Sequence, residues 1–169
     1  MTLRLRRLRI EDKDAAIAGH QAMMAENFTL LLGWSDDKDW PSYLRYIDEN
    51  ARSTTVNADR VPGTLLVADV DGTLVGRASI RFALNDWLAL HGGHIGYGVL
   101  AEHRRKGYAT EILRQALDVA RAHGVERVLV TCDDTNVASA AVIERCGGVL
   151  ERVVPASDND VSFRRYWID

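Results

Sequence analysis

The residues that most suggest chemistry are three consecutive cations, Arg104 to Lys106, which stand directly before Gly107. An amphipathic helix is expected to begin there, and its N-terminus already carries partial positive charge and unpaired N–H groups. A phosphate or pyrophosphate would accept hydrogen bonds from those groups and neutralise the cations. Gly107 has no Cβ, so the backbone can approach phosphate oxygens closely. The pattern predicts an anion site; the alternative is an exposed basic turn partly balanced by Glu102 and Glu111.

A strand before this basic run and a helix after it must position these groups. Residues His94 to Leu100 read as a strand, and Gly107 to His123 as a helix with one apolar stripe. Gly124 is a natural stop for that helix. The basic run therefore lies where a strand passes into a helix.

A competing phosphate motif overlaps the strand. Gly96, Gly98 and Ala101 match the dinucleotide-binding pattern of Gly, one residue, Gly, two residues, Gly or Ala. These glycines fall inside a strand, however, and the following helix does not begin at Ala101. A nicotinamide or flavin site is therefore not favoured.

The other expected elements combine paired strands with alternating strands and helices. The hairpin is the firmest of them, because Asp71-Gly72 is a pair that tight type I′ turns prefer. We expect strands at Leu3 to Leu5, Thr64 to Val70, Thr73 to Phe82, Arg127 to Cys132, Val149 to Val154 and Phe163 to Ile168, and helices from Glu11, from Asp39 to Asn50 and from Asn136 to Cys146. This order predicts an α/β (α+β mixed) fold, a mixed sheet covered by helices on its faces.

Composition limits the classes of protein. The 169 residues, 47% hydrophobic and 27% charged, suit one domain spanning residues 1–169. The net charge of −3 argues against nucleic-acid binding. No apolar run approaches the roughly 18 residues that a membrane helix needs, and no signal-peptide core is present, so we expect a cytoplasmic protein without a membrane partner. Cys132 and Cys146 lack metal-ligand spacing and read as buried thiols.

The basic run resembles the signature of the GNAT superfamily of acyl-coenzyme A-dependent N-acetyltransferases, which is Arg or Gln, two residues, Gly, one residue, then Gly or Ala. Arg104, Gly107 and Ala109 match it. Residues 133–139 and 144–148 look like the second conserved segment of that family. The resemblance covers about residues 64–151, and it implies a central mixed, mostly antiparallel sheet with splayed middle strands, flanked by helices on both faces.

The resemblance also implies a site for acetyl-coenzyme A, with no metal. The pantetheine arm would pair with main-chain groups of Tyr97 and Val99 in the gap between the strands at 94–100 and 127–132. Asn136 would contact the arm or simply cap its helix. Gly96 and Gly98 would leave room for the thioester and substrate. The predicted cofactor-binding residues are Tyr97, Val99, Leu100, Arg104, Arg105, Lys106, Gly107, Tyr108, Ala109, Thr110, Asn136 and Ser139.

One departure from the family pattern concerns the acid that protonates the leaving thiolate. Many members carry a tyrosine where this chain has Ile143. Tyr166, Tyr97 or solvent would then supply the proton, and the Tyr97 N–H is the first candidate to stabilise the carbonyl oxygen. His94 is the first candidate for the base, against a structural role for its ring, and Asp133 is a lesser one. No third ligand lies near His94 and its neighbour His91, so no metal site is expected.

The resemblance implies transfer of an acetyl group to the amine of a small molecule or peptide. A noncatalytic acyl-coenzyme A-binding or sensing module is the alternative, which the isoleucine at 143 permits, and a protein that binds another phosphate ligand is a third reading. Acceptor specificity is expected to reside in the irregular segments 28–40 and 85–93. A homodimer is expected only from the family resemblance.

Overall fold

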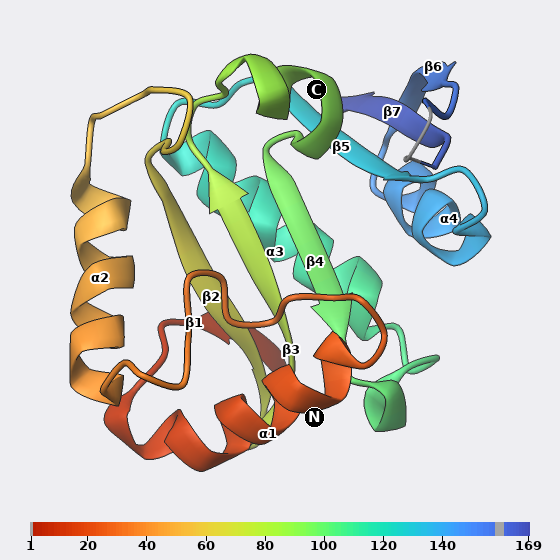
Figure 1. The fold of residues 1–169 in the computed structure, drawn as a ribbon. Coiled ribbons are helices and arrows are strands. Elements are labelled where there is room, and N and C mark those ends of the chain that lie inside the picture. Colours follow the sequence, from red (N-terminus) through yellow and green to blue (C-terminus); the bar gives the residue numbers. More distant parts are fainter. Residues whose placement is uncertain (1, 158–160) are drawn as a thin grey trace.

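The computed structural model describes residues 2–157 and 161–169, which form two sheets whose paired strands all run antiparallel (Figure 1). The first sheet has the order β1-β2-β3-β4 and the second has the order β5-β7-β6. Their bounds are β1 Leu3–Arg6, β2 Gly63–Val70, β3 Thr73–Arg81, β4 Ile95–Val99, β5 Val128–Asp133, β6 Val149–Val154 and β7 Phe163–Ile168.

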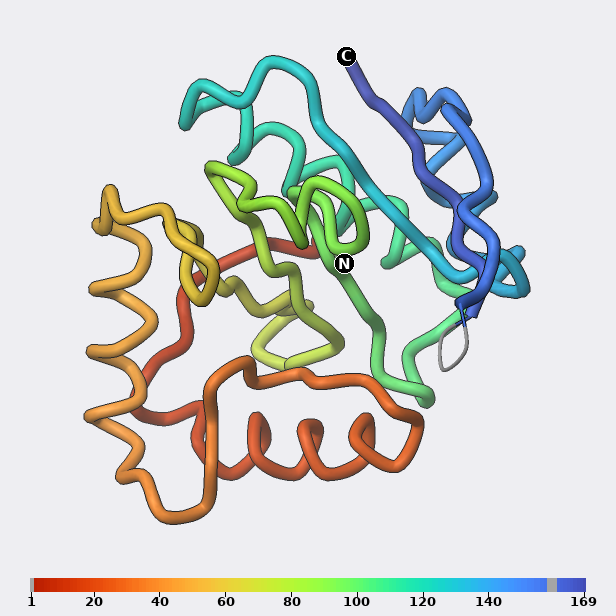
Figure 2. The backbone as a smooth tube through the Cα atoms, turned by 45° about the horizontal axis from the view of Figure 1, so that its top comes forward, coloured from red at the N-terminus to blue at the C-terminus, as the bar shows by residue number. Residues whose placement is uncertain are grey.

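Four helices cover the first sheet and the gap beside it: α1 Lys13–Met24, α2 Trp40–Arg52, α3 Tyr108–Ala122 and α4 Val137–Arg145. Helix α3 packs on β1, β3 and β4, whereas α1 lies on the opposite side of the strands (Figure 2). Helix α2 begins after Asp39, whose side chain accepts a hydrogen bond from the Ser42 N–H, and carries Pro41 in its first turn. Helices on both faces agree with the predicted fold class.

Strand β2 shows how one sheet serves two hydrophobic cores. Leu66 and Ala68 face the cluster that includes α3, while Leu65 and Val67 face the cluster beneath α1 and α2. This alternation is the period of a strand buried on both faces. The sheet is therefore a rigid layer between two packed faces.

The predicted turn between β2 and β3 is confirmed. Asp71 has φ 51° and Gly72 has φ 87°, the left-handed conformations that a type I′ turn requires. The strands and helices begin and end within a few residues of their predicted limits. The segment 85–93, expected to be a loop, instead contains a helical turn, Leu88–Gly92, whose first N–H bonds to the Asn85 side chain.

The two sheets meet at one end of β4 and β5. The His94 N–H donates to the Leu129 carbonyl at 2.7 Å, and the Leu129 N–H donates to His94 Nδ1 at 2.9 Å. Beyond this junction the described residues of β4 and β5 form no ladder, so the strands splay apart as the resemblance implied. No helix in the described residues is both long and apolar enough to cross a membrane.

Candidate active site

Two residues of the basic turn, residues 104–107, have left-handed backbone conformations. Arg105 has φ 62° and Gly107 has φ 81°. Helix α3 starts at Tyr108, and no side chain of the described residues caps its first N–H groups. A Cβ on Gly107 would meet none of the described atoms within 4 Å, so there is open space beside this glycine. The geometry is suited to an anion held by backbone donors.

The cations of the basic turn are not equivalent. Arg104 Nε donates to the Val99 carbonyl at 2.9 Å, and its Nη2 pairs with Glu26 at 2.7 Å. The carboxylate that pairs with Arg104 thus comes from the segment just after α1, and not from Glu102 or Glu111, the partners named in the alternative reading of an exposed basic turn. Arg104 therefore connects the residues that follow α1 with the end of β4.

A cavity of about 670 Å³ opens beside the basic turn, between β4 and α4. It brings together the predicted cofactor-binding residues except Leu100, which is buried in the core, and Lys106. It is lined by Met23, Glu26, Phe28, Tyr97, Gly98, Val99, His103, Arg104, Arg105, Gly107, Tyr108, Ala109, Thr110, Asn136, Ala138, Ser139, Ala141, Val142 and Arg145.

One edge of β4 offers main-chain groups to this cavity. The Leu100 N–H bonds to the Val75 carbonyl at 2.9 Å, and antiparallel ladders alternate bonded and non-bonded pairs. The N–H groups of Tyr97 and Val99 therefore face away from β3, toward the gap. The Val99 carbonyl is already an acceptor for Arg104, which leaves the Val99 N–H for a bound ligand.

The Tyr97 side chain spans the gap from β4 to α4. Its hydroxyl lies 2.9 Å from Ser139 Oγ, within hydrogen-bond distance. Burial raises the pKa of Tyr97 to about 12. The phenol therefore stays protonated at neutral pH and can donate a proton or a hydrogen bond.

The start of α4 forms the opposite wall. Asn136 Oδ1 accepts a hydrogen bond from the Ser139 N–H at 3.0 Å, so this side chain caps the helix, one of the two roles expected for it. Ile143, at the position where many family members carry a tyrosine, is fully buried. It offers the cavity no proton donor.

Two predicted catalytic side chains lie outside the cavity. The His94 ring is buried at the junction of the sheets, where burial and the charge of Arg81 lower its pKa to about 4. Tyr166 is fully buried and donates to Glu144 at 3.0 Å. Neither side chain lines the cavity, so we assign neither His94 as the base nor Tyr166 as the acid of the proposed reaction.

The room expected above the strand glycines is filled by protein. A Cβ on Gly98 would lie 2.6 Å from Phe28 and 3.1 Å from Met23. The guanidinium of Arg77 lies over Gly96, 3.4 Å from where its Cβ would be. The glycines therefore admit these side chains rather than substrate. Phe28 belongs to the segment 28–40 that was expected to determine acceptor specificity, whereas Met23 is a cavity residue that the sequence did not predict.

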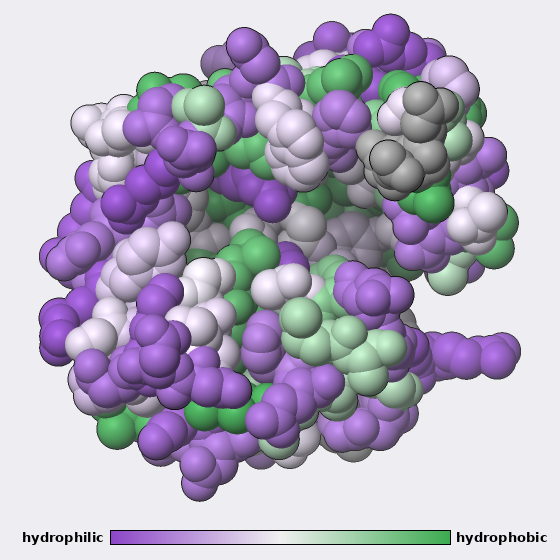
Figure 3. Space-filling view, in the orientation of Figure 1, coloured by the Kyte–Doolittle hydropathy of each residue, from purple (hydrophilic) through white to green (hydrophobic). Residues whose placement is uncertain are grey.

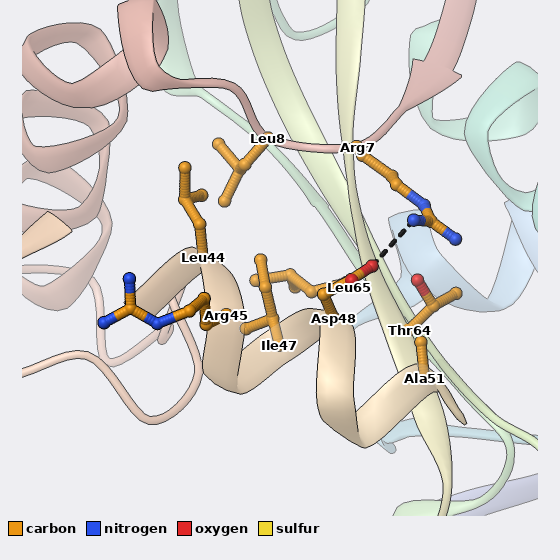
Figure 4. Close-up of a pocket in the computed structure, with 9 residues that line it drawn as sticks. All are labelled: Arg7, Leu8, Leu44, Arg45, Ile47, Asp48, Ala51, Thr64 and Leu65. Atoms are coloured by element: carbon orange, nitrogen blue, oxygen red, sulfur yellow. Dashed lines mark hydrogen bonds and ion pairs between the residues drawn. The ribbon is translucent and has the colours of Figure 1, made fainter. Parts of the chain in front are cut away.

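A second cavity, of about 320 Å³, lies between α2 and β2 (Figure 4). Its walls include Leu8, Leu44 and Ile47, and its edge carries an ion pair between Arg7 and Asp48 at 2.7 Å. Because Arg7 and Asp48 are paired with each other, neither is an evident reactive group of this cavity. This cavity does not include residues of the basic turn or β4.

Comparison with known proteins identifies the class. Residues 2–149 match the family described as "Acetyltransferase (GNAT) domain", and the chain belongs to this family. It is a GNAT acetyltransferase, as the resemblance predicted. Among curated protein sequences, none matches the chain.

Three solved structures illustrate the similarity. RimJ from Mycobacterium smegmatis, in complex with CoA-disulfide, is 21% identical, with a TM-score of 0.72 over 98% of this chain and 81% of that one. YncA, a putative acetyltransferase from Salmonella typhimurium with acetyl-CoA, is 16% identical, with a TM-score of 0.66 over 100% and 94%. A GNAT-family acetyltransferase from Streptococcus pneumoniae is 17% identical, with a TM-score of 0.68 over 98% of each chain. At these identities the likeness supports the fold.

Proposed function

We propose that residues 1–169 form a single domain that binds acetyl-coenzyme A in the cavity beside the basic turn and transfers the acetyl group to a primary amine. The observation that carries this proposal is the start of α3, which no side chain of the described residues caps, with open space beside Gly107 and residues 107–110 in the lining of the cavity. RimJ and YncA were solved with CoA-disulfide and acetyl-CoA, and the same cofactor suits this site.

The cofactor would lie along three consecutive parts of the cavity. The N–H groups of residues 105–110 would hold its pyrophosphate, aided by the charge of Arg105. The N–H groups of Tyr97 and Val99 would pair with the pantetheine arm, as an added strand pairs with an open edge. The Ser139 hydroxyl, at the other wall, would contact the arm or the thioester.

Acetyl-coenzyme A supplies an activated acyl group as a thioester. The neutral amine nitrogen bonds to the carbonyl carbon, the carbon–sulfur bond breaks, and the amine loses one proton while the thiolate gains one. A main-chain N–H on β4, with Tyr97 the first choice, would stabilise the charge that develops on the carbonyl oxygen. The Tyr97 phenol, bonded to Ser139, is suited to deliver a proton to the thiolate, and solvent can also do so because the thiol is acidic.

No histidine or carboxylate takes the role of base in this proposal. The His94 pKa of about 4 makes that ring a weak base at neutral pH, and its Nδ1 already accepts the Leu129 N–H. Water would carry the amine proton away. Activity should therefore rise with pH as the acceptor itself loses its proton.

The proposed function is tested by measuring coenzyme A binding and acetyl transfer separately. Calorimetry with coenzyme A is expected to show saturable binding, and mixing acetyl-coenzyme A with a panel of amines is expected to release free thiol. Absence of binding would remove the cofactor assignment. Binding without thiol release for any amine would favour a sensing module. The homodimer stays a prediction, which light scattering in solution can check.

A further inference from the structure

Strand β3 carries two arginines, Arg77 and Arg81, on the face of the sheet opposite α3, with Ser79 between them. The intervening residues Ala78 and Ile80 face the α3 core, which fixes the direction of the other three. We call Arg77, Ser79 and Arg81 the arginine strip. Arg77 is 5% exposed, and Arg81 is partly buried.

The arginine strip holds positive charge that the described residues do not neutralise. Arg77 donates to the Gly96 and Thr29 carbonyls at 2.8 and 2.7 Å, and Arg81 donates to the Gly93 carbonyl at 3.1 Å. Within residues 2–157 and 161–169, neither guanidinium forms an ion pair with a carboxylate. Neutral carbonyls satisfy hydrogen-bonding groups but do not cancel a buried charge.

Arg165 provides the contrast. It is buried to a similar degree, donates to main-chain carbonyls as well, and is paired with Glu151 at 2.6 Å. On the strip, Arg77 also has a buried Nε for which the described residues offer no partner. Burial and the neighbouring charge of Arg81 lower the pKa of Arg77 to about 9, so it is still a cation at neutral pH.

Space beside the strip is available to a ligand. A pocket of about 130 Å³ reaches Ser79 and Arg81, and its other walls include Tyr46 and Asn50. No acidic side chain is among the described residues that line it. The space-filling view shows this face of the molecule hollowed across the middle of the sheet (Figure 3).

The strip also lies next to the proposed reaction centre. Arg77 bonds to the carbonyl of Gly96, the residue before Tyr97, and Gly96 pairs with Ser79 across the β3–β4 ladder. By contrast, the cavity in Figure 4 lies on β2, and its Arg7 is already paired with Asp48. An acceptor that reaches the Tyr97 N–H would thus have unneutralised positive charge beside it.

We infer that the amine acceptor carries an anionic oxyacid group, a carboxylate or a phosphate, which binds along the arginine strip while the amine reaches the thioester beside Tyr97. This inference rests on the proposed function, because it identifies the acceptor by its charge. A guanidinium offers two parallel N–H groups to either oxyacid. The strip binds the acceptor and takes no part in bond making.

The first experiment compares matched acceptors with the unmodified protein. Free L-amino acids are paired with their α-carboxamides, and phosphoethanolamine is paired with ethanolamine, at equal concentrations of neutral amine. The anionic member of at least one pair is expected to have a kcat/KM about tenfold or more higher, the effect of one charge-assisted hydrogen bond. The pair that shows the preference identifies carboxylate or phosphate.

The second experiment removes the strip's charge. In the Arg81→Gln variant the preference for the anionic member is expected to fall to within about threefold, with KM for acetyl-coenzyme A unchanged. Arg77→Gln is expected to act in the same direction. Arg52→Gln, on the exposed face of α2, is the matched control and should keep the preference.

The outcomes separate the inference from the proposed function. Equal use of neutral and anionic amines by the unmodified protein would overturn the inference alone, as would a preference that survives both strip variants. Failure of every amine to release thiol would overturn the proposed function instead. If one strip variant does not fold, the other still tests the role of the strip, and the comparison of matched acceptors still tests the charge of the acceptor.

Discussion

The cofactor side and the acceptor side of the proposed site are built in different ways. On the cofactor side, the basic turn and the start of α3 present main-chain N–H groups, and the decisive feature is a glycine with φ 81° and no cap on the helix. On the side proposed for the acceptor, the arginine strip lies outside the lining of the cofactor cavity, and its Arg77 and Arg81 side chains donate to the carbonyls of Thr29 and Gly93, from distant parts of the chain.

This difference separates the recognition of phosphates from the selection of an acceptor. Backbone donors recognise phosphates whatever the neighbouring side chains are, so a short motif is enough to specify them. Side chains such as Phe28 and Arg77, which we propose to lie beside the acceptor, can favour one acceptor over others without altering the backbone donors. Disrupting one side should therefore leave the other intact.

The largest effect is expected from Gly107→Ala. The added Cβ would project into the space proposed for the pyrophosphate and would weaken two charge-assisted hydrogen bonds, so coenzyme A affinity should fall about a hundredfold. Calorimetry measures this directly.

Gly72→Ala is the matched control for that change. Gly72 also has a left-handed φ, 87°, and also has no atom within 4 Å of an added Cβ, but it lies in the hairpin turn. Both variants should lose about 1 kcal/mol of stability because alanine disfavours that φ. Equal coenzyme A affinity in the two variants would contradict the backbone site.

The next effect concerns His94, where the two sheets meet. Its pKa is lowered to about 4 in the folded protein, mainly by burial, from the ordinary histidine pKa of 6.5. The unfolded chain therefore binds the proton more readily, so this contribution to stability is complete above pH 6.5 and is lost as pH falls toward 4. Between pH 7.5 and 5 the loss should be about 2 kcal/mol.

The His94→Gln variant isolates this contribution, because a glutamine oxygen can still accept the Leu129 N–H. Urea unfolding at pH 7.5 and 5 should show a smaller loss of stability on acidification in the variant than in the parent protein. Acetyl transfer should keep the parent's pH profile. A loss of the rise in rate with pH would restore His94 as a candidate base.

The sequence predicted the cofactor side better than the acceptor side, for a physical reason. The strand, basic turn and α3 are contiguous, so local periodicity and one glycine motif locate them. The pairing of Arg104 with Glu26 joins residues 78 positions apart, and no local pattern reveals it. For the helical turn in segment 85–93, the sequence offers one indication, Asn85, whose side chain caps the Leu88 N–H. The turn is too short for its apolar residues to show a helical periodicity.

Sequence also misread the strand glycines for a related reason. Gly96 and Gly98 correctly indicated a close approach to β4, but the approaching groups are Arg77 and Phe28 from this chain. A glycine in a strand indicates that another group approaches the backbone closely, but it does not identify that group. The same limit explains His94, whose type suggested a base although burial lowers its pKa.

A smaller effect is expected from Tyr97→Phe, which tests the junction between the two sides. Removing the hydroxyl should lower kcat about tenfold, which is less than a general acid usually contributes because the thiol leaves readily, while KM for acetyl-coenzyme A changes little. In the parent protein, a pKa of about 12 predicts no alkaline decline in rate below about pH 10. Tyr108→Phe, in the same cavity, is the control and should retain kcat.

The smallest effect is expected from Arg105→Gly, which changes the cofactor side in two opposing ways. Arg105 has φ 62°, a conformation that disfavours side chains, so glycine should stabilise the fold by up to about 1 kcal/mol. Loss of the guanidinium should weaken coenzyme A binding about threefold and reduce its dependence on salt. Asp71→Gly, at φ 51° in the hairpin turn, should give a similar gain in thermal stability with unchanged affinity. If Arg105→Gly binds coenzyme A as the parent does at every salt concentration, the backbone N–H groups alone hold the phosphates. The cofactor would then be recognised by the main chain alone, in contrast to the side chains proposed to bind the acceptor.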